Sequence, residues 1–299
     1  MQALLSRTNP YLLLTLTVLF WSGNMVIARG VHEQVPPIAL AFWRWTIALM
    51  LVLPFALPHL RTQWHLVCKG WLPLLILGLL SVGGYNTFMY IALQTTLATN
   101  VTMLNSFVPV ATIVLAFVLL GKRLSVLEGF GVCLSLSGVL LIIGRGSLET
   151  LLGLSLNAGD LWMLLAVLTW GLYTVGLHWR PPGLNPMLML AVMTVVGLLA
   201  IAPAYAWELS TGRQIELDPS TLTAIIYVGI FPGFLGYVFF NAGVAAVGPN
   251  RSALFLHLTP VFGTILAVLF LGERPLWFHF AGIGLVFTGI FLTTRKPHA

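Results

Sequence analysis

Long apolar stretches separated by short polar turns recur along the whole chain. Because an α-helix needs about 20 apolar residues to cross the hydrocarbon core of a bilayer, each stretch predicts a membrane-spanning helix. The turns between them, such as GKR at 121–123 and RPPG at 180–183, are too short to hold a soluble domain. The pattern predicts an all-α polytopic membrane protein with ten spans, at residues 11–29, 36–58, 70–93, 97–120, 125–143, 158–178, 185–207, 219–246, 249–271 and 275–293.

The composition agrees with this class. Apolar residues make up 59% of the chain and charged residues only 7%, whereas soluble domains carry about 25% charged residues. The net charge of +6 comes from basic residues scattered in short loops, unlike the basic patches with interleaved aromatics that bind nucleic acid. Cys68 and Cys133 fit neither a metal-binding spacing nor a disulfide. We expect no metal, no cofactor and no nucleic-acid partner.

The loop charges predict the orientation of the chain. If the N-terminus is cytoplasmic, nine Lys and Arg residues fall on the cytoplasmic side and four on the other side. Basic residues favour cytoplasmic loops. We therefore expect both termini to be cytoplasmic.

The second half of the sequence repeats the first. Residues 109–124 read PVATIVLAFVLLGKRL, and residues 260–275 read PVFGTILAVLFLGERP. When the chain is shifted by 151 residues, eleven of 33 aligned positions from Pro109 onward are identical. We expect two five-helix units, residues 1–146 and 147–299, within one transmembrane domain.

Two weaker matches extend the repeat toward the beginning of each unit. GYNTF at 84–88 aligns with GYVFF at 236–240, and Trp21 aligns with Trp170. Because each unit has an odd number of spans, the two units must enter the membrane from opposite sides. Inverted repeats of this kind are typical of secondary transporters, which bind substrate near the membrane midplane between the units.

These motifs resemble the EamA branch of the drug/metabolite transporter superfamily. The resemblance covers essentially the whole chain and includes WSGN at 21–24, FWRW at 42–45 and the Pro-Val motif of each unit. The first unit departs from the family's usual LGE by reading LGKR at 120–123, so no shared role is implied for Glu273. The resemblance implies a bacterial inner-membrane exporter of small metabolites, and the chain looks most like the exporters of amino acids, including aromatic ones.

Polar side chains and aromatic rings inside the predicted spans are the candidate substrate contacts, because polar groups are costly at membrane depth. The rings would suit an ammonium group or an aromatic side chain, although tryptophan and tyrosine also serve in packing and at interfaces. The candidate substrate-binding residues are Trp21, Asn24, Arg44, Tyr85, Asn105, Ser106, Trp170, Tyr173, Tyr237 and His257.

Several of these positions have two interpretations. In one interpretation, Arg44 pairs with a substrate carboxylate. In the other, its side chain extends to the membrane–water interface or donates to a backbone carbonyl. His257 would contact substrate or carry a coupled proton, or simply bond as a neutral ring to a neighbouring helix. Pro109 and Pro260 are candidate hinges, because a proline frees the carbonyl four residues earlier; a kink satisfied by neighbouring groups is the alternative. FPGFLGY at 231–237 is expected to be bent or broken.

The sequence favours a transporter over an enzyme. It has no phosphate-binding GxxxxGK[ST] motif, and no nucleophile is paired with an acid–base group. No Asp or Glu lies deep in any predicted span, so we expect facilitated diffusion. We also expect a monomer that exports by alternating access. Proton-coupled efflux through His257 and translocation of a lipid-linked metabolite stay open as alternatives. The competing class of function is a membrane-embedded enzyme or a sensor.

Reporter fusions test the predicted topology. Because both ends are predicted to be cytoplasmic, green fluorescent protein should fluoresce when fused to either end, and alkaline phosphatase should be inactive there. A phosphatase fused after residue 146 should be active, which serves as the internal control. Termini on opposite sides of the membrane would contradict the inverted repeat.

Overall fold

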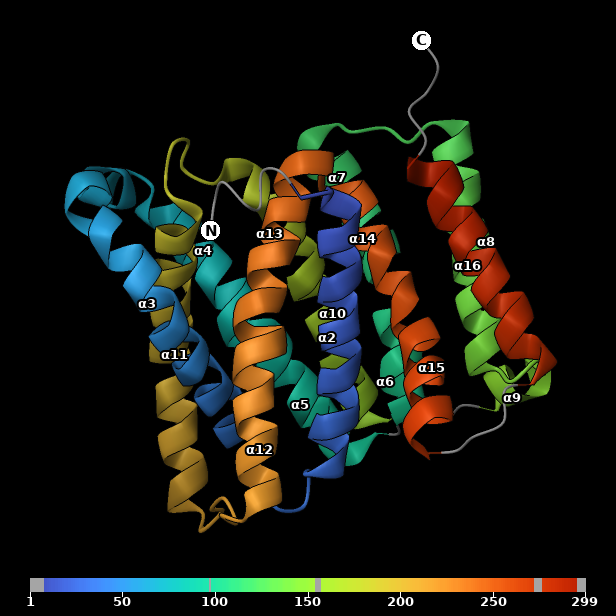
Figure 1. The fold of residues 1–299 in the computed structure, drawn as a ribbon, viewed down its shortest axis with the longest axis horizontal. Helices are drawn as coiled ribbons and strands as arrows, with labels where there is room; N and C mark the ends of the chain where they lie inside the picture. The colour runs from blue at the N-terminus through green and yellow to red at the C-terminus, as the bar shows by residue number, and fades with distance from the viewer. Residues whose placement is uncertain (1–7, 97, 154–156, 272–275, 295–299) are drawn as a thin grey trace.

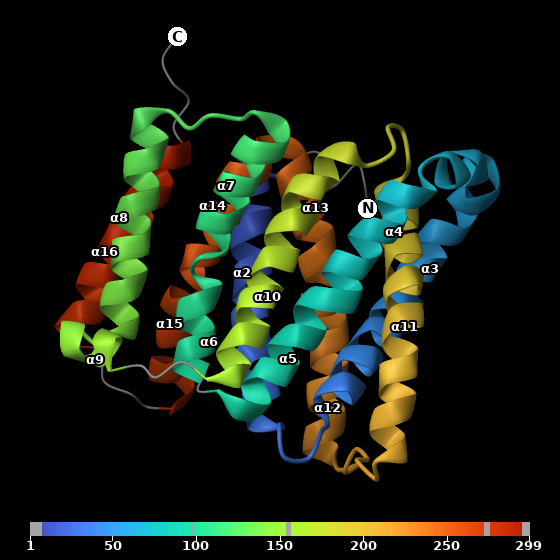
Figure 2. The same ribbon diagram turned by 180° about the vertical axis from the view of Figure 1, so that it is seen from behind.

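A computed structural model describes residues 8–96, 98–153, 157–271 and 276–294, and the regular structure in these ranges is helical. The helices run between two ends of the molecule, called here the upper and lower ends as drawn (Figures 1 and 2). The elements are α2 (Pro10–Gly30), α3 (Pro37–Lys69), α4 (Trp71–Gly78), η1 (Leu79–Tyr85), α5 (Asn86–Thr95), α6 (Ala98–Asn105), α7 (Val108–Leu120), α8 (Val126–Ile143), α9 (Leu148–Leu152), α10 (Ala158–Gly176), η2 (Leu177–Trp179), α11 (Pro186–Ser210), α12 (Pro219–Val228), η3 (Gly229–Leu235), α13 (Gly236–Val247), α14 (Pro249–Leu254), η4 (Phe255–Leu258), α15 (Thr259–Leu271) and α16 (Trp277–Thr294).

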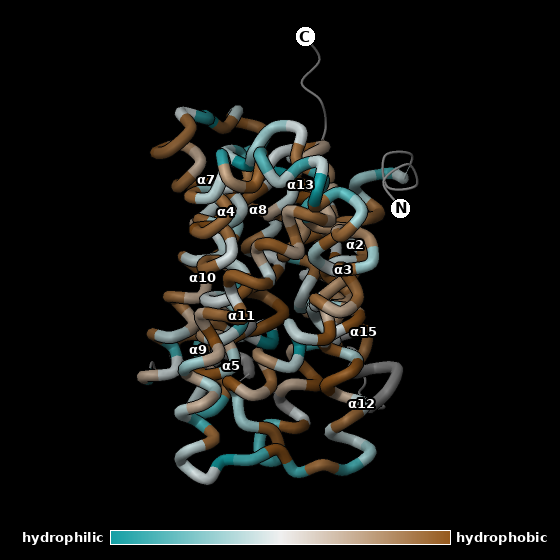
Figure 3. The backbone as a smooth tube through the Cα atoms, turned by 90° about the vertical axis from the view of Figure 1, so that its left-hand side faces the viewer, coloured by the Kyte–Doolittle hydropathy of each residue, from teal (hydrophilic) through white to brown (hydrophobic). Residues whose placement is uncertain are grey.

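Eight helical segments of the described chain are long and apolar enough to span a membrane, and they match the first eight predicted spans. The predicted ninth span contains α14, η4 and α15, and α16 supplies a shorter apolar helix at the predicted tenth. Hydrophilic residues lie mostly toward the two ends, with apolar stretches along the helices between them (Figure 3). The GER turn at 272–274 lies outside the described residues.

The predicted end of the second span at residue 58 is wrong as a helix boundary. Helix α3 continues through Pro54 and Pro58 to Lys69. Hydropathy predicts where the chain leaves the hydrocarbon core, but it does not predict where the helix ends. Polar residues outside the hydrocarbon can continue the same helix. The ribbon of α3 curves at the upper left of Figure 1, as expected where prolines remove backbone hydrogen bonds.

The two halves of the chain begin at opposite ends of the molecule. Pro10 and Leu13, in the first turn of α2, line a cavity together with Arg180 and Pro181, which follow the end of α10. Helix α2 therefore begins where α10 finishes, and the two helices run in opposite directions (Figures 1 and 2). This is the arrangement that an inverted repeat requires. The boundary between residues 146 and 147 stays a prediction.

Each half contains one stretch of π-helix at a corresponding place. Segment η1 precedes α5, and η3 precedes α13, each with seven residues. The stretch 231–237, expected to be bent or broken, is irregular but not broken: it is wound as a π-helix as far as Leu235 and continues into α13. Its Pro232 lies inside the wide turn, where the i→i+5 pattern accommodates a missing donor.

The two repeated prolines lie at helix starts. Pro109 is the second residue of α7, after a break at Ser106 and Phe107, and Pro260 is the second residue of α15, after the tight turn η4. A proline in the first turn of a helix removes no intrahelical bond. In place of mid-helix kinks, a turn at Ser106 and Phe107 precedes Pro109, and the 3-10 segment η4, which joins α14 to α15 without interruption, precedes Pro260.

Helices α8 and α16 are the last of each half and pack closely (Figures 1 and 2). A Cβ added to Gly138 would lie 2.6 Å from the carbonyl oxygen of Gly282, and one added to Gly131 would lie 2.6 Å from that of Gly289. Under the 151-residue shift, Gly131 corresponds to Gly282 and Gly138 to Gly289. The pairs therefore cross over, as the two sides of a two-fold interface do.

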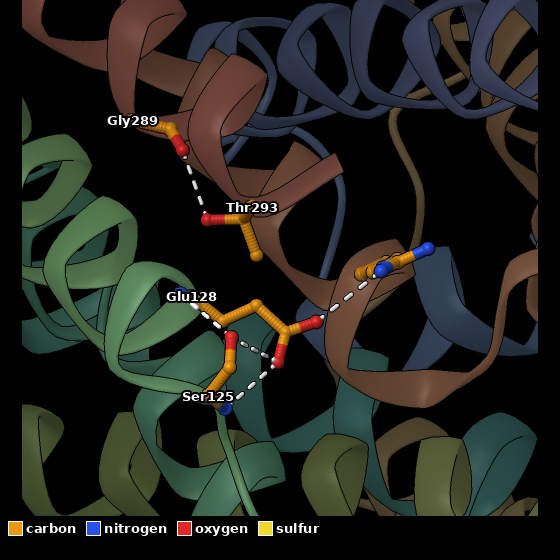
Figure 4. Close-up of polar contacts among 5 residues, drawn as sticks. Ser125, Glu128, Gly289 and Thr293 are labelled. Atoms are coloured by element: carbon orange, nitrogen blue, oxygen red, sulfur yellow. Dashed lines mark hydrogen bonds and ion pairs between the residues drawn. The ribbon is translucent and has the colours of Figure 1, made fainter. Parts of the chain in front are cut away.

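Polar contacts within each helix lie at the upper end of this pair (Figure 4). Ser125 and Glu128 form a capping box at the start of α8, and the Thr293 hydroxyl donates to the Gly289 carbonyl at 2.9 Å (Figure 4). Glu128 also forms an ion pair with Arg251 of α14 at 3.3 Å. This pair joins the last helix of the first half to the second half.

The glycine contacts make a matched pair of substitutions informative. Gly282→Leu should lower the free energy of unfolding by about 1–3 kcal/mol, because overpacking pushes the two backbones apart. Gly284→Leu should change it little, since nothing lies within 4 Å of a Cβ there. Thermal unfolding of both variants in detergent measures the difference. Equal effects would contradict close packing of α8 on α16.

Candidate functional site

Five of the predicted residues form one aromatic cluster at the centre of the molecule. Its members are Trp21 of α2, Tyr85 of η1, Trp170 and Tyr173 of α10, and Tyr237 of α13. The Trp170 ring is the hub, with centroids 4.8 Å from Tyr85, 4.9 Å from Trp21 and 5.1 Å from Tyr173. Trp21 and Tyr237 meet Trp170 edge to face, a favourable arrangement for aromatic rings.

The cluster lies where the two halves meet. Trp21 and Trp170 occupy corresponding positions of the repeat and contact each other. Ser106 and His257, which correspond under the 151-residue shift, are also joined, at 2.9 Å. Contact between a residue and its own counterpart occurs only close to a two-fold axis. The site is therefore built around the pseudo-two-fold axis of the repeat.

Arg44 of α3 lies beside this cluster, deep in the molecule, and is 1% exposed. Its Nη1 donates to the Tyr90 hydroxyl at 2.9 Å, and that hydroxyl donates to Asn24 Oδ1 at 2.8 Å. Its Nη2 donates to the Pro232 carbonyl oxygen at 3.1 Å. Arg44 therefore does not extend to the interface: it bonds to a carbonyl and to a side chain inside the protein.

The Pro232 carbonyl joins Arg44 to the aromatic cluster. It accepts from Arg44 and also from the Trp21 Nε1–H, at 3.0 Å. Pro232 lies inside the π-helix η3, and the next α-helix closes back with a bond from Gly236 N to the Phe231 carbonyl. The wide turn thus presents one carbonyl to two side-chain donors, which explains why irregular backbone persists in this buried place.

The charge on Arg44 has no carboxylate partner in the part of the chain that the structure describes, where Arg251–Glu128 is the ion pair found. Its Nε is also buried without an acceptor, as are the Nε1 atoms of the neighbouring Trp45 and of Trp170. An uncompensated charge and unpaired donors are costly away from water. The centre of the molecule is consequently a place that favours an added anionic, acceptor-rich group.

The remaining predicted residues border the cluster on the side of α6 and η4. The Tyr85 hydroxyl donates to Asn105 Oδ1 at 2.9 Å. His257 is buried, with Nε2 on the Ser106 carbonyl at 2.9 Å and Nδ1 on the Ser135 hydroxyl at 2.7 Å. Because a carbonyl only accepts, Nε2 carries a proton. His257, which lies in η4 before Pro260, thus joins the turn at Ser106, which precedes Pro109, to α8.

The structure therefore brings all ten predicted contact residues into one buried region, and it adds members that the sequence did not single out. Tyr90 bridges Arg44 and Asn24, and Ser135 holds His257. Trp45 packs edge to face on Tyr237 at 4.7 Å. The sequence could have singled out Trp45, because it directly follows Arg44. Nothing in the sequence singles out Ser135, which lies in an apolar span.

A cavity of about 590 Å³ leads from the upper end toward this region. It is lined by the start of α2, the turn after α10 and the face of α13 that carries Asn241. Asn241 Oδ1 accepts a 2.5 Å bond from the Tyr173 hydroxyl. Asn241 therefore separates the cavity from the aromatic cluster, whose rings fill the space beyond it rather than leaving an open hollow.

The mouth of this cavity is basic. An adjoining cavity of about 530 Å³ shares Arg180 and Gly183 with it and is also lined by Lys122 and His178. Lys122 and Arg123 line a third hollow beside the Glu128–Arg251 ion pair. The linings of these three cavities contain one acid, Glu128, and four cations, Lys122, Arg123, Arg180 and Arg251. The excess of positive charge at the entrance attracts anions.

A second buried acid, besides Asp160, lies near the end of α11, just beyond the predicted end of the seventh span at residue 207. Helix α11 continues to Ser210, and Glu208 within it is buried. Its carboxylate accepts from the backbone N–H of Ala39 at 2.7 Å and of Ile38 at 3.3 Å. It caps the start of α3, where the first N–H groups of a helix have no internal partner.

Comparison with known proteins agrees with the architecture. The EamA-like transporter family matches residues 8–144 and again residues 157–295. An uncharacterized transporter of Archaeoglobus fulgidus is 27% identical, with 98% of this chain and 99% of that one covered. The uncharacterized transporter YyaM of Bacillus subtilis is 25% identical over 96% of this chain and 93% of its own. A crystal structure covering 96% of this chain and 98% of its own superposes with a TM-score of 0.77 at 19% identity, which shows a shared fold.

The fold and the repeat thus define a helical transporter of the membrane. The chain belongs to the EamA-like transporter family, with one copy of the family unit in each half. It is a multi-pass membrane protein.

Removing the Tyr90 hydroxyl tests the bonding around Arg44. Tyr90→Phe should lower the free energy of unfolding by about 1–3 kcal/mol, because Arg44 Nη1 and Asn24 Oδ1 both lose a buried partner. Tyr227→Phe is the control: its hydroxyl meets the Phe20 carbonyl at 3.5 Å, too long for a strong bond. Thermal unfolding in detergent compares them, and an unchanged Tyr90→Phe variant would show that Arg44 finds other acceptors.

Proposed function

We propose that the protein is a secondary transporter that exports small metabolites carrying a carboxylate, with amino acids, including aromatic ones, as the substrates that fit best. The observation that carries the proposal is the buried guanidinium of Arg44 beside an aromatic cluster, with no carboxylate near it in the described chain. A substrate carboxylate would supply the missing counter-charge through charge-assisted hydrogen bonds.

The aromatic cluster suits the other end of such a substrate. Its ring faces attract an ammonium group, and its edges and faces pack against another aromatic ring. Trp21 and Arg44 share the Pro232 carbonyl, so the two kinds of recognition lie next to each other. Because the rings now fill the centre, substrate has to displace some of them, and Trp170, as the hub, is the first candidate.

The entrance supports export. Lys122, Arg123, Arg180 and Arg251 all lie at the upper end, and the distribution of basic residues assigns this end to the cytoplasm. A carboxylate in the cytoplasm would be drawn toward the entrance and would reach the cluster past Asn241. The cavities at this end support a conformation that is ready to load from the cytoplasm.

Alternating access follows from two inverted five-helix units, residues 1–146 and 147–299, with α14–α15 as the ninth span and α16 as the tenth. The opposite directions of α2 and α10 support this arrangement. Pro109 and Pro260 are the proposed hinges, because each follows a change in helical winding near the pseudo-two-fold axis, a turn at Ser106 and Phe107 in one half and the 3-10 segment η4 in the other. We place this monomer in the inner membrane of a bacterium with both termini in the cytoplasm.

Facilitated diffusion is the proposed energetic mode. The two buried acids in the described chain, Asp160 and Glu208, are each bound by backbone N–H groups at a helix start, and neither forms an ion pair with Arg44. No described carboxylate is left at the centre to relay protons, so flux should follow the substrate gradient. A pH gradient imposed on proteoliposomes checks this: uphill uptake driven by that gradient, abolished by His257→Ala, would replace facilitated diffusion with proton antiport.

Flux of an amino-acid panel into proteoliposomes tests the substrate site. Arg44→Gln should weaken apparent affinity for tryptophan about 10-fold to 100-fold, because a hydrogen bond to a charged group contributes about 1.5–3 kcal/mol. Tryptamine, which lacks the carboxylate, should lose much less. Trp170→Ala should reduce flux of both, since both use the ring cluster.

Two controls separate binding from folding. Arg44→Lys keeps the charge but not the two-pronged geometry, so it should recover part of the tryptophan affinity. Each variant is compared at matched protein content after size-exclusion chromatography. No flux of any amino acid by the purified parent protein would favour a sensor or an enzyme, and equal losses for tryptophan and tryptamine would remove Arg44 from carboxylate recognition.

A further inference from the structure

A second feature of the molecule lies on its outer side, between α3 and α11. These helices pack along each other (Figure 1) and leave an open groove of about 270 Å³. Every residue in its lining is apolar or a tryptophan. The walls include Leu53, Leu57, Leu60 and Trp64 of α3, with Leu188 and Val195 of α11.

A basic stripe runs along α3 directly beside the groove. Leu57 of the groove wall is followed at intervals of four residues by Arg61, His65 and Lys69. Residues four apart lie one above the other on a helix, so the three side chains continue the line of Leu57. All three are exposed. The helix thus presents an apolar wall and, next to it, a line of positive charge.

This stripe has no internal counter-charge in the described structure. The ion pair found there, Arg251–Glu128, involves none of its members. The sequence contains no acid at all between Glu33 and Glu128. The positive charge of Arg61 and Lys69 is therefore available to a group from outside the protein.

Neighbouring tryptophans place the stripe at the membrane surface. Trp64 and Trp71 are 56% and 60% exposed, and tryptophan favours the level of the lipid headgroups. Along α11 the groove lining runs from Leu188 to Val196, a rise of about 12 Å, which is comparable with the roughly 15 Å depth of one hydrocarbon leaflet. The groove is therefore matched to an acyl chain, and the stripe to the headgroup above it.

We propose that this place binds an anionic phospholipid of the cytoplasmic leaflet, with an acyl chain in the groove and the phosphate on Arg61 and Lys69. A zwitterionic headgroup fits less well, because its ammonium would oppose the stripe. Juxtamembrane cations attract anionic lipids in this way. The site is separate from the substrate region, and its existence does not depend on what the protein transports.

The lipid would join the two halves of the transporter. Helix α3 belongs to the first half and carries Arg44, whereas α11 belongs to the second half. Their upper ends are already tied by the bond from the Asn185 N–H to Gln63 Oε1, at 2.8 Å. A chain in the groove would extend this contact along both helices.

Native mass spectrometry of the detergent-purified full-length protein tests the site. Phosphatidylglycerol and phosphatidylcholine with identical chains are titrated separately. The parent should retain phosphatidylglycerol better by about fivefold for each cation that contacts it. Arg61→Gln combined with Lys69→Gln should bring phosphatidylglycerol down to the level of phosphatidylcholine. Arg213→Gln, in the turn after α11, should keep the full preference.

A second pair of variants tests the groove itself. Val195→Trp fills the groove from an exposed position of α11 and should reduce binding of both lipids. Leu199→Trp, one helical turn away and outside the groove lining, should leave both unchanged. Equal retention of the two lipids by the parent, or an undiminished preference in the Arg61 and Lys69 double variant, would overturn the proposal. Size-exclusion profiles and unfolding temperatures like the parent's establish that each variant is folded.

Discussion

A guanidinium buried in a membrane without a carboxylate has to be surrounded by oxygen atoms, and the centre of this protein is arranged around that requirement. Arg44 uses the Tyr90 hydroxyl, which is itself held by Asn24, and a backbone carbonyl from η3. The carbonyl is available because η3 is wound as a π-helix. One costly side chain therefore explains a polar relay, an irregular helix and the attachment of Trp21 to the same oxygen.

The pseudo-two-fold axis organises the rest. Corresponding residues meet at the centre, as Trp21 meets Trp170, and corresponding glycines cross over between α8 and α16. Both halves carry a π-helical stretch, and in both the α-helical winding changes before a proline, at a turn before Pro109 and at η4 before Pro260. The side chains placed on this shared backbone differ, however. Ser106 in one half faces His257 in the other, so the two sides of the site are alike in shape but not in chemistry.

The basic residues at the upper end lie in two different places. Lys122, Arg123 and Arg180 line the cavities that lead inward, whereas Arg61 and Lys69 lie on the outer surface beside an apolar groove. Under the proposed orientation, the same bias that orients a membrane protein would act on two classes of anion, one dissolved in the cytoplasm and one held in the leaflet. Their separation by α3 keeps the substrate route distinct from the lipid-facing surface.

The sequence by itself determined the features that depend on the solvent around the chain and on periodicity. Apolar length predicts the first eight spans, and the 151-residue shift predicts two related halves, because lipid imposes length and internal repetition is written residue by residue. It also singled out ten candidate residues that the structure places together, since a polar or aromatic side chain at membrane depth is conspicuous. Helix ends were harder to predict: α3 passes both of its prolines, and Pro109 and Pro260 start helices instead of kinking them.

Only the tertiary structure decided which polar groups form hydrogen bonds with one another. That Tyr90 serves Arg44, that Ser135 holds His257 and that Glu208 caps α3 are contacts between segments far apart in the chain, and hydrogen bonding at such separations depends on packing that no local pattern records.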